Sequence, residues 1–345
     1  MRVGICGYPG SGKSTVFAAL APGGSNERDG VAFGNIQVPD ARVDRLAEIY
    51  RPKKTTYATI TFVDVGGGGG SSRGAFPPDV LQHMRNMDVL VHVVRVFANP
   101  MLTELADSAR DVRMFEDELV LLDHGILEKR LERFHKERAR GLEVEVNERC
   151  VAHLVDGNPL RTLGLNDEDR ATLTGIQLLS LRPLITLYNL SEDAWEDPEY
   201  AGLREATEPE DNQVSMAMCG TLEAEIAQMP TEEQAEFLEG LELGEPARNP
   251  FIRQAYALLD LISFLTAGED ECRAWTIRRG SNARRAGRAI HSDIERGFIR
   301  AEVHRLADLE EAGSEAELKK QGKLRVEGKD YVVQDGDIMN FRFNV

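Results

Sequence analysis

The sequence predicts an α/β protein whose main domain is built on a mostly parallel sheet with helices on both faces. Two observations lead to this prediction. Short apolar runs alternate with helical segments, which is the pattern of repeated βαβ units. The first apolar run also leads directly into a glycine-rich loop and then into a helix. The predicted strands cover residues 2–6, 59–64, 89–94, 184–188 and 214–218.

The glycine-rich loop reads Gly7-Tyr-Pro-Gly-Ser-Gly-Lys13-Ser14 and fits the G-x-x-x-x-G-K-[ST] pattern of phosphate-binding loops. Glycine lets the backbone wrap closely, so that N–H groups point at phosphate oxygens, and the helix start adds its positive dipole end. The lysine of this pattern reaches the β- and γ-phosphates, and the serine ligates Mg²⁺. A turn that matches by chance is the alternative. The predicted phosphate-binding residues are Gly10, Ser11, Gly12, Lys13, Ser14 and Thr15.

Composition limits the classes of protein that the chain can belong to. A length of 345 residues allows two or three domains. The formal net charge of −17 excludes a protein that coats nucleic acid through bulk charge, but a local basic patch is compatible with it. No run of about 18 consecutive apolar residues is present, so we expect no membrane span. The four cysteines lack metal-site spacing, and the first residues already form a core strand rather than a signal peptide, so we expect a cytoplasmic protein.

The alternation of strands and helices breaks between about residues 111 and 181. Apolar residues recur at helical spacing up to residue 140, and a second helical run covers 145–153, which predicts an inserted helical hairpin. The charge run 128–138 is interpreted as a solvated helix face, with a partner-binding tip as the alternative. From about residue 262 the pattern predicts a small mixed α/β module. The predicted domains are therefore 1–110 with 182–261, then 111–181, then 262–345.

An Asp-x-x-Gly sequence follows the second predicted strand. An acid at this place can hold Mg²⁺ through a water, and the glycine N–H can sense the γ-phosphate. We therefore predict Ser14 and Asp64 as metal ligands and Gly67 as a further phosphate contact. The five glycines at 66–70 predict a mobile switch segment, and a flexible loop without a function is the alternative.

A segment that could read the base follows the strand 184–188. Guanine is usually read by Asn-Lys-x-Asp, but here the sequence is Asn189-Leu-Ser-Glu192. The longer Glu192 side chain displaces the carboxylate that would accept the guanine N1 and N2 protons. Guanine preference is therefore weakened and adenine becomes plausible, whereas a polar loop at a strand end is the alternative.

The chain resembles the YchF / Obg-like ATPase family over nearly its whole length. Eight stretches carry the resemblance: Val38-Pro-Asp-Ala-Arg42, His92-Val-Val-Arg95, Leu222-Glu-Ala-Glu225, Phe264-Leu-Thr-Ala-Gly268, Ala274-Trp-Thr-Ile277, Gly287-Arg-Ala-Ile-His291, Glu327-Gly-Lys-Asp-Tyr-Val-Val-Gln-Asp-Gly-Asp337 and the closing Phe341-Arg-Phe-Asn-Val345. The resemblance implies a Ras-like P-loop NTPase domain, an inserted α-helical hairpin and a C-terminal TGS domain of β-grasp shape. It also implies a cytoplasmic location, ATP in preference to GTP, and association with ribosomes or RNA.

The resemblance also implies a set of base-binding residues. Asn189, Leu190 and Glu192 stand where the family has its Asn-x-x-Glu motif. Residues 214–218 stand where the family has a base loop like Ser-Ala-Lys, so Ser215 and Met216 are expected to contact the base.

Two departures from the family pattern concern hydrolysis. The family has a switch threonine before Val-Pro-Asp, but residues 21–34 contain no threonine, and Ser25 is a weakly supported substitute. The family's Asp-x-Ala-Gly-Leu is replaced by Asp64-Val-Gly-Gly-Gly68. These changes leave phosphate and base binding intact but predict very slow turnover, and no catalytic residue is assigned.

Three functions remain open at this stage. The first is a monomeric ATPase whose nucleotide state controls its association with the ribosome or rRNA, and the second is a GTP-preferring GTPase with the same role. The third is a nucleotide-sensing adaptor with little or no hydrolysis. A small-molecule kinase is disfavoured, because no acceptor pocket or basic lid is evident. The basic run at 278–288 is a candidate contact for rRNA phosphates, and a solvated loop is the alternative.

Overall fold

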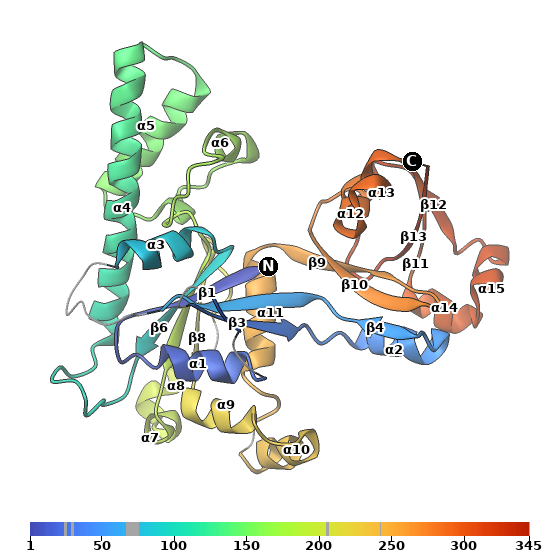
Figure 1. Ribbon diagram of the computed structural model, residues 1–345, viewed down its shortest axis with the longest axis horizontal. Coiled ribbons are helices and arrows are strands. Elements are labelled where there is room, and N and C mark those ends of the chain that lie inside the picture. The colour runs from blue at the N-terminus through green and yellow to red at the C-terminus, as the bar shows by residue number, and fades with distance from the viewer. Residues whose placement is uncertain (24–25, 29–30, 67–75, 205–206, 242, 345) are drawn as a thin grey trace. The chain divides into compact units, whose positions relative to one another are not determined.

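The computed structural model describes residues 1–23, 26–28, 31–66, 76–204, 207–241 and 243–344 (Figure 1). The chain forms two compact units. The first unit comprises Met1–Ile36 and Thr61–Leu258, and the second comprises Gln37–Ile60 and Leu259–Val345. Among the described helices, none combines the length and the apolar character needed to cross a bilayer.

A seven-stranded sheet forms the centre of the first unit, within its described residues. The strand order is β2-β3-β5-β1-β6-β7-β8. Strands β1, β5, β6, β7 and β8 run parallel, and β2 pairs with β3 in the antiparallel sense. The strands are β1 (Arg2–Cys6), β2 (Asn26–Arg28), β3 (Val31–Gln37), β5 (Thr59–Asp64), β6 (Val89–Arg95), β7 (Leu184–Asn189) and β8 (Gln213–Met218). The five strands predicted from the sequence are confirmed, and β6 is buried along its whole length, as its largely apolar sequence requires.

Helices cover both faces of this sheet. Figure 1 shows α3 and the lower part of α4 on one face and α1 and α9 on the other. The helices are α1 (Lys13–Leu20), α3 (Pro78–Arg85), α4 (Ser108–Glu137), α7 (Glu192–Glu196), α8 (Ala201–Arg204), α9 (Gly220–Ile226), α10 (Thr231–Gly240) and α11 (Arg248–Leu258). The core on the α3 and α4 face joins Met84 and Phe115 of these helices to Val63 and Leu90 of the strands. The expected α/β class is therefore confirmed.

The predicted helical hairpin corresponds to α4 and the following α5 (Leu142–Val155), with α6 (Asp167–Thr172) packed beside α5. Helix α4 spans 30 residues, so the domain boundary expected at residue 111 falls inside it. Its first turns belong to the sheet core through Phe115 and Leu119. Its later turns pack on α5 through Leu127. One continuous helix thus connects the sheet to the hairpin.

The second unit contains a six-stranded sheet in the order β12-β11-β13-β9-β10-β4, counted over its described residues. Its strands are β4 (Lys54–Thr56), β9 (Leu261–Thr266), β10 (Glu271–Arg278), β11 (Phe298–His304), β12 (Arg325–Glu327) and β13 (Ile338–Phe343). Its helices are α2 (Ala41–Tyr50), α12 (Ala283–Ile290), α13 (Ser292–Arg296), α14 (Leu306–Ala312) and α15 (Glu315–Lys320). Strand β9 is buried on both faces, because Phe264 and Leu265 belong to two different cores.

The segment Gln37–Ile60 lies in the second unit, although the sequence-based boundaries assigned it to the first domain. Strand β4 pairs with β10 in the parallel sense, and Val43 and Leu46 of α2 share a core with Leu265. Residues more than 200 positions apart in the chain therefore form one sheet edge. A three-residue strand and a short amphipathic helix carry no pattern that indicates which of two sheets they join.

Candidate nucleotide-binding site

The loop between β1 and α1 has the backbone of a phosphate-binding loop. Gly10 and Gly12 have φ angles of 78° and 87°, in the left-handed region that favours glycine. A Cβ atom on Gly12 would lie 2.2 Å from the Asn189 Nδ2 atom, and one on Gly10 would lie 2.6 Å from Leu102 Cδ1. Both glycines are therefore required by conformation and by close approach of the neighbouring chain.

Lys13 lies in the first turn of α1 and is largely buried. Its Nζ donates a hydrogen bond to the Tyr8 carbonyl oxygen at 3.2 Å. Burial lowers the pKa of the Lys13 ammonium, and the nearby Asp64 carboxylate opposes this effect. A buried cation whose recorded acceptor is a neutral carbonyl is suited to binding a phosphate.

Ser14 and Asp64 lie side by side, as the two predicted metal ligands must. The Ser14 hydroxyl donates to Asp64 Oδ2 at 3.3 Å. The other oxygen, Oδ1, is buried and has no hydrogen-bond partner among the described residues. Burial raises the pKa of Asp64, while Lys13 and Ser14 oppose the rise. A hydroxyl and an unpaired carboxylate oxygen fit Mg²⁺, which takes a few protein oxygens and completes its shell with phosphate and water.

Asn189 connects the phosphate loop to the start of α9. Its Nδ2 donates to the Ser11 carbonyl at 3.0 Å, and its Oδ1 accepts from the Gly220 N–H at 3.0 Å. Both ends of this buried amide are engaged by the backbone. Asn189 therefore holds the phosphate loop and the start of α9 together, and it also lines the neighbouring cavity.

A cavity of about 580 Å³ joins the phosphate loop to the predicted base-reading segment. Its lining residues are Gly10, Gly12, Thr15, Phe97, Asn99, Asn189, Leu190, Ser191, Glu192, Asp193 and Thr221. The volume lies within the range of small-ligand and cofactor sites. The cavity is at the carboxyl ends of the parallel strands, where ligands of such sheets bind.

Ser215 and Met216 were expected to contact the base, but they lie inside β8, where they pair with Thr186 and Leu187. Neither lines the cavity, and Thr221, beyond the strand, lines it instead. A short motif with no lysine could not show where strand β8 ends and its loop begins. Gly67 and Ser25, and most of the predicted switch segment, lie outside the described residues.

Sequence reasoning also missed Phe97 and Asn99. The side chain of Asn99 donates to the Gly10 carbonyl at 3.3 Å, and Phe97 lines the cavity. Both follow β6, so the rule that ligands bind at the carboxyl ends of parallel strands could have identified them.

An aromatic cluster lies behind the phosphate loop. Tyr8 stacks on Phe76 with ring centroids 5.9 Å apart, and His92 stacks on Phe115 at 4.0 Å. The Phe76 N–H donates to the Glu118 carboxylate of α4. Burial lowers the pKa of His92 to about 3, so its imidazole is neutral. His92 is therefore a packing residue, and the cluster connects the loop to the first turns of α4.

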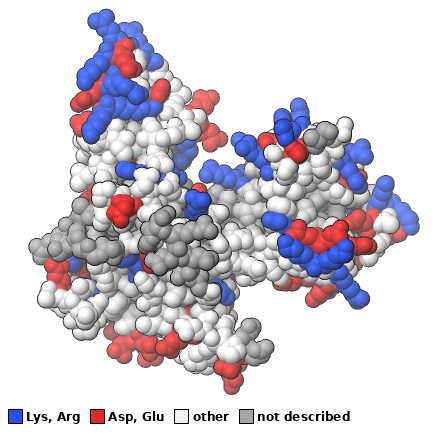
Figure 2. Space-filling model, in the orientation of Figure 1, with Lys and Arg blue, Asp and Glu red and all other residues white. Residues whose placement is uncertain are grey.

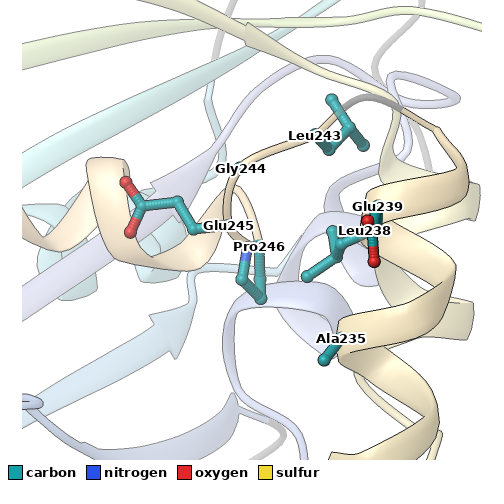
Figure 3. Close-up of a pocket in the computed structure, with 7 residues that line it drawn as sticks. All are labelled: Ala235, Leu238, Glu239, Leu243, Gly244, Glu245 and Pro246. Carbon is teal, nitrogen blue, oxygen red and sulfur yellow. The ribbon is translucent and has the colours of Figure 1, made fainter.

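A second cavity, of about 470 Å³, lies between α10 and the start of α11 (Figure 3). It is lined by Ala235, Leu238, Glu239, Leu243, Gly244, Glu245 and Pro246. The charged residues of this lining are both acidic, and Glu245 pairs with Arg253. Carboxylates repel phosphate, so this cavity is not a second nucleotide site.

Comparisons with known proteins agree with this geometry. Residues 2–124 match a family model described as a 50S ribosome-binding GTPase, and residues 261–344 match the YchF-GTPase_C model, described as a protein of unknown function (DUF933). The chain is 37% identical over 362 residues to the ribosome-binding ATPase YchF of Haemophilus influenzae, covering 100% of this chain and 99% of the relative. It is 36% identical over 365 residues to the Bacillus subtilis protein of the same name, covering 100% of both. The solved structure of the Schizosaccharomyces pombe YchF GTPase matches with a TM-score of 0.86 at 28% identity, covering 99% of this chain and 97% of that one.

Proposed function

Because this chain belongs to the YchF family, we propose that it is an ATP-binding P-loop NTPase whose nucleotide state controls its association with the ribosome. One observation carries the proposal. A single cavity joins the phosphate loop to the segment Asn189–Glu192, with room for a nucleotide. The relatives are named ribosome-binding ATPases, which supports ATP as the nucleotide and the ribosome as the partner.

The lining of the cavity supports ATP over GTP. Leu190 stands where a guanine-reading site has lysine, and Glu192 carries its carboxylate on a longer side chain than the usual aspartate. Phe97 adds an aromatic surface on which a purine can stack. These contacts favour a flat purine, but they place no carboxylate where it would accept the guanine N1 and N2 protons.

Binding of the phosphates follows from the loop. Its N–H groups and Lys13 would hold the β- and γ-phosphates, and Ser14 and Asp64 would hold Mg²⁺. When bound, Mg²⁺ neutralises charge on the phosphates. The protein residues then act by positioning and electrostatic stabilisation.

A nucleotide-sensing adaptor is the second candidate. The observation that favours it is the lack of threonine in residues 21–34, because a switch threonine normally closes on Mg²⁺ and the γ-phosphate. Slow hydrolysis and no hydrolysis are the two outcomes that separate the candidates.

We also propose a cytoplasmic, monomeric protein with an inserted helical hairpin and a C-terminal TGS domain of β-grasp shape. The free, buried state of all four cysteines is in keeping with a reducing compartment.

The test compares wild-type protein with Lys13→Ala in two assays. We expect ATP-dependent co-sedimentation of the wild type with ribosomes, and phosphate release above the buffer rate, with both lost in the variant. Co-sedimentation that does not depend on ATP, or that is unchanged by Lys13→Ala, would contradict the proposal. Phosphate release at the buffer rate with intact ATP-dependent sedimentation would select the adaptor.

A further inference from the structure

The loop between β6 and α4 lies against the phosphate loop. The Asn99 side chain donates a hydrogen bond to the Gly10 carbonyl oxygen at 3.3 Å. A Cβ atom on Gly10 would lie 2.6 Å from Leu102 Cδ1, so the Leu102 side chain occupies the space beside this glycine. Asn99 and Leu102 are partly buried, whereas their neighbours Ala98 and Met101 are exposed. Two inward-facing side chains of this loop therefore meet at Gly10.

A turn fixes the position of these two side chains. The Leu102 N–H donates to the Asn99 carbonyl at 3.0 Å, and the Met101 N–H donates to Asn99 Oδ1 at 3.0 Å. Pro100 suits the second position of such a turn, because its ring presets the φ angle. Since Oδ1 is engaged within the turn, the amide nitrogen of Asn99 is directed at Gly10. The local chain thus aims one donor at the phosphate loop.

The far end of this loop is fastened to the sheet and to α4. The buried Arg95 side chain of β6 donates through Nη2 to the Glu104 carbonyl at 3.0 Å. The Nη1 atom of Arg110, in the first turn of α4, lies 3.7 Å from Glu104 Oε2. These contacts restrict the loop before any nucleotide binds. The contacts with Gly10 are therefore preorganised, and binding does not have to order a free segment.

Two asparagine amides hold successive carbonyls of the phosphate loop. Asn99 holds the Gly10 carbonyl, and Asn189 of β7 holds the Ser11 carbonyl. In a planar trans peptide, the C=O and the N–H point in opposite directions. Holding a carbonyl therefore fixes the direction of the N–H of the same peptide, on which phosphate binding by such a loop depends. Asn99 contributes to the shape of the loop in the same way as Asn189.

The loop from β6 to α4 makes these contacts without charge. Residues 96–106 contain one charged residue, Glu104. Figure 2 shows mostly uncharged side chains in the part of the first unit where Figure 1 draws this loop. A neutral hydrogen bond and a packing contact shape the phosphate loop but supply no cation for the phosphates. Their contribution to nucleotide binding is therefore one of position, and Lys13 supplies the charge.

We propose that the turn 99–102 is a clamp that holds the phosphate loop in its binding form, with Asn99 and Leu102 as positioning residues for the phosphates. This inference rests on the proposed function and adds two residues that determine affinity for the phosphate chain. The clamp acts through Gly10, so its effect should be the same for ATP and for GTP. Asn99 also lines the cavity, and direct contact with the base is the alternative that the test must separate.

The test compares two double variants of the full chain in competition titrations with ATP and GTP. Asn99→Ala/Leu102→Ala removes the clamp. The matched control is Met101→Ala/Leu105→Ala, because these side chains belong to the same loop and are 89% and 85% exposed. The clamp variant should bind ATP about tenfold more weakly, and GTP by the same factor, because a lost hydrogen bond and a displaced loop weaken phosphate binding. The control should stay within about twofold of wild type.

The single variant Asn99→Ala keeps the packing of Leu102 on Gly10, so it serves if the double variant is unstable. It should weaken binding of both nucleotides equally, by about threefold. Loss of ATP affinity without loss of GTP affinity would show that Asn99 contacts the base, and would overturn the inference. So would a clamp variant that binds both nucleotides as tightly as the control does.

The wild-type titration separates this inference from the proposed function. Wild-type protein that binds neither nucleotide would contradict the proposed function, and this inference with it. Wild-type protein that binds ATP, together with a clamp variant that binds ATP equally well, would contradict only the role of Asn99 and Leu102.

Discussion

Gly12 of the phosphate loop and the Asn189 side chain approach each other so closely that no side chain fits between them. Gly12 begins α1 in a left-handed conformation, and the Asn189 amide fills the space where its Cβ would lie. The same amide holds the Ser11 carbonyl and the Gly220 N–H. Binding of phosphate and placement of the base loop therefore depend on one contact.

Replacing Gly12 by alanine tests this contact against a matched control. Gly175 has the same φ of 87°, but its Cβ would meet nothing within 4 Å. Gly175→Ala should cost only the conformational strain, about 1 to 2 kcal/mol. Gly12→Ala should cost more stability and weaken ATP binding at least tenfold, because the Asn189 amide must move. Urea unfolding and ATP titration measure the two effects, and ATP affinity within twofold of wild type would contradict this account.

At the scale of elements, Asp123 of the long helix α4 binds the segment before β7 through hydrogen bonds to Leu179 and Ser180. Its buried carboxylate accepts hydrogen bonds from the Leu179 N–H, the Ser180 N–H and the Ser180 hydroxyl, at 2.7 to 3.0 Å. Three donors on another segment thus depend on one side chain of α4.

Asp123→Ala leaves these donors without their acceptor. We expect a loss of about 2 to 5 kcal/mol in the free energy of unfolding, since each buried unpaired donor costs about 1 to 3 kcal/mol and relaxation recovers part of it. Asp117 lies on the same helix and is exposed, so Asp117→Ala is the control and should change stability by less than about 0.5 kcal/mol. Similar losses in the two variants, measured by urea unfolding, would contradict the assignment.

The same carboxyl makes stability depend on pH. Burial raises the pKa of Asp123 above its unfolded value, against the opposing effect of its hydrogen bonds. The folded state then binds the proton more tightly, so the free energy of unfolding falls as pH rises through the window between the two pKa values, and levels off above it. Asp123→Asn removes this titration. The free energy of unfolding of the wild type minus that of Asp123→Asn should therefore decrease with rising pH across that window. A difference that grows with pH would mean that the pKa of Asp123 is lower in the folded state than in the unfolded state, which would contradict this account.

Much of the site was predictable because its parts carry local patterns. The phosphate loop needs glycine, lysine and serine at fixed spacing, and Ser14 and Asp64 come together because parallel strands end at one edge. Phe97, Asn99 and Thr221 follow strands β6 and β8, so the same rule indicates the loops that carry them, but no local pattern singles out these side chains. They depend on how loops with no defining pattern fold over the cavity.

At the scale of the whole molecule, the second unit is built from two distant pieces of chain. Residues 37–60 supply the edge strand β4 and the helix α2, and residues from 259 onward supply the remainder. Arg42, in a stretch that carries the family resemblance, bonds Asp40 and Asp335. Local pattern predicted a small mixed α/β module in the C-terminal part of the chain, but not this long-range pairing.

A pair of substitutions in α2 tests whether an N-terminal segment stabilises the C-terminal module. Leu46 is fully buried, whereas Ile49 on the same helix is 37% exposed. Leu46→Ala should destabilise the second unit by about 2 to 5 kcal/mol, and Ile49→Ala by less than about 1 kcal/mol. The chain has two tryptophans, so Trp195→Phe leaves Trp275 of β10 as the only tryptophan, and excitation that is selective for tryptophan then reports on this unit. Equal, small shifts of the Trp275 transition would contradict the assignment of α2 to the second unit.

The central claim is that the cavity between the phosphate loop and Asn189–Glu192 binds ATP in preference to GTP. The most direct measurement is an equilibrium titration of nucleotide-free protein with fluorescent ATP and GTP analogues and Mg²⁺, each competed by the unlabelled nucleotide. This account predicts clearly tighter binding of ATP, because Leu190 and Glu192 replace the residues that recognise guanine. GTP binding as tight as ATP binding, or no binding of either nucleotide, would contradict it.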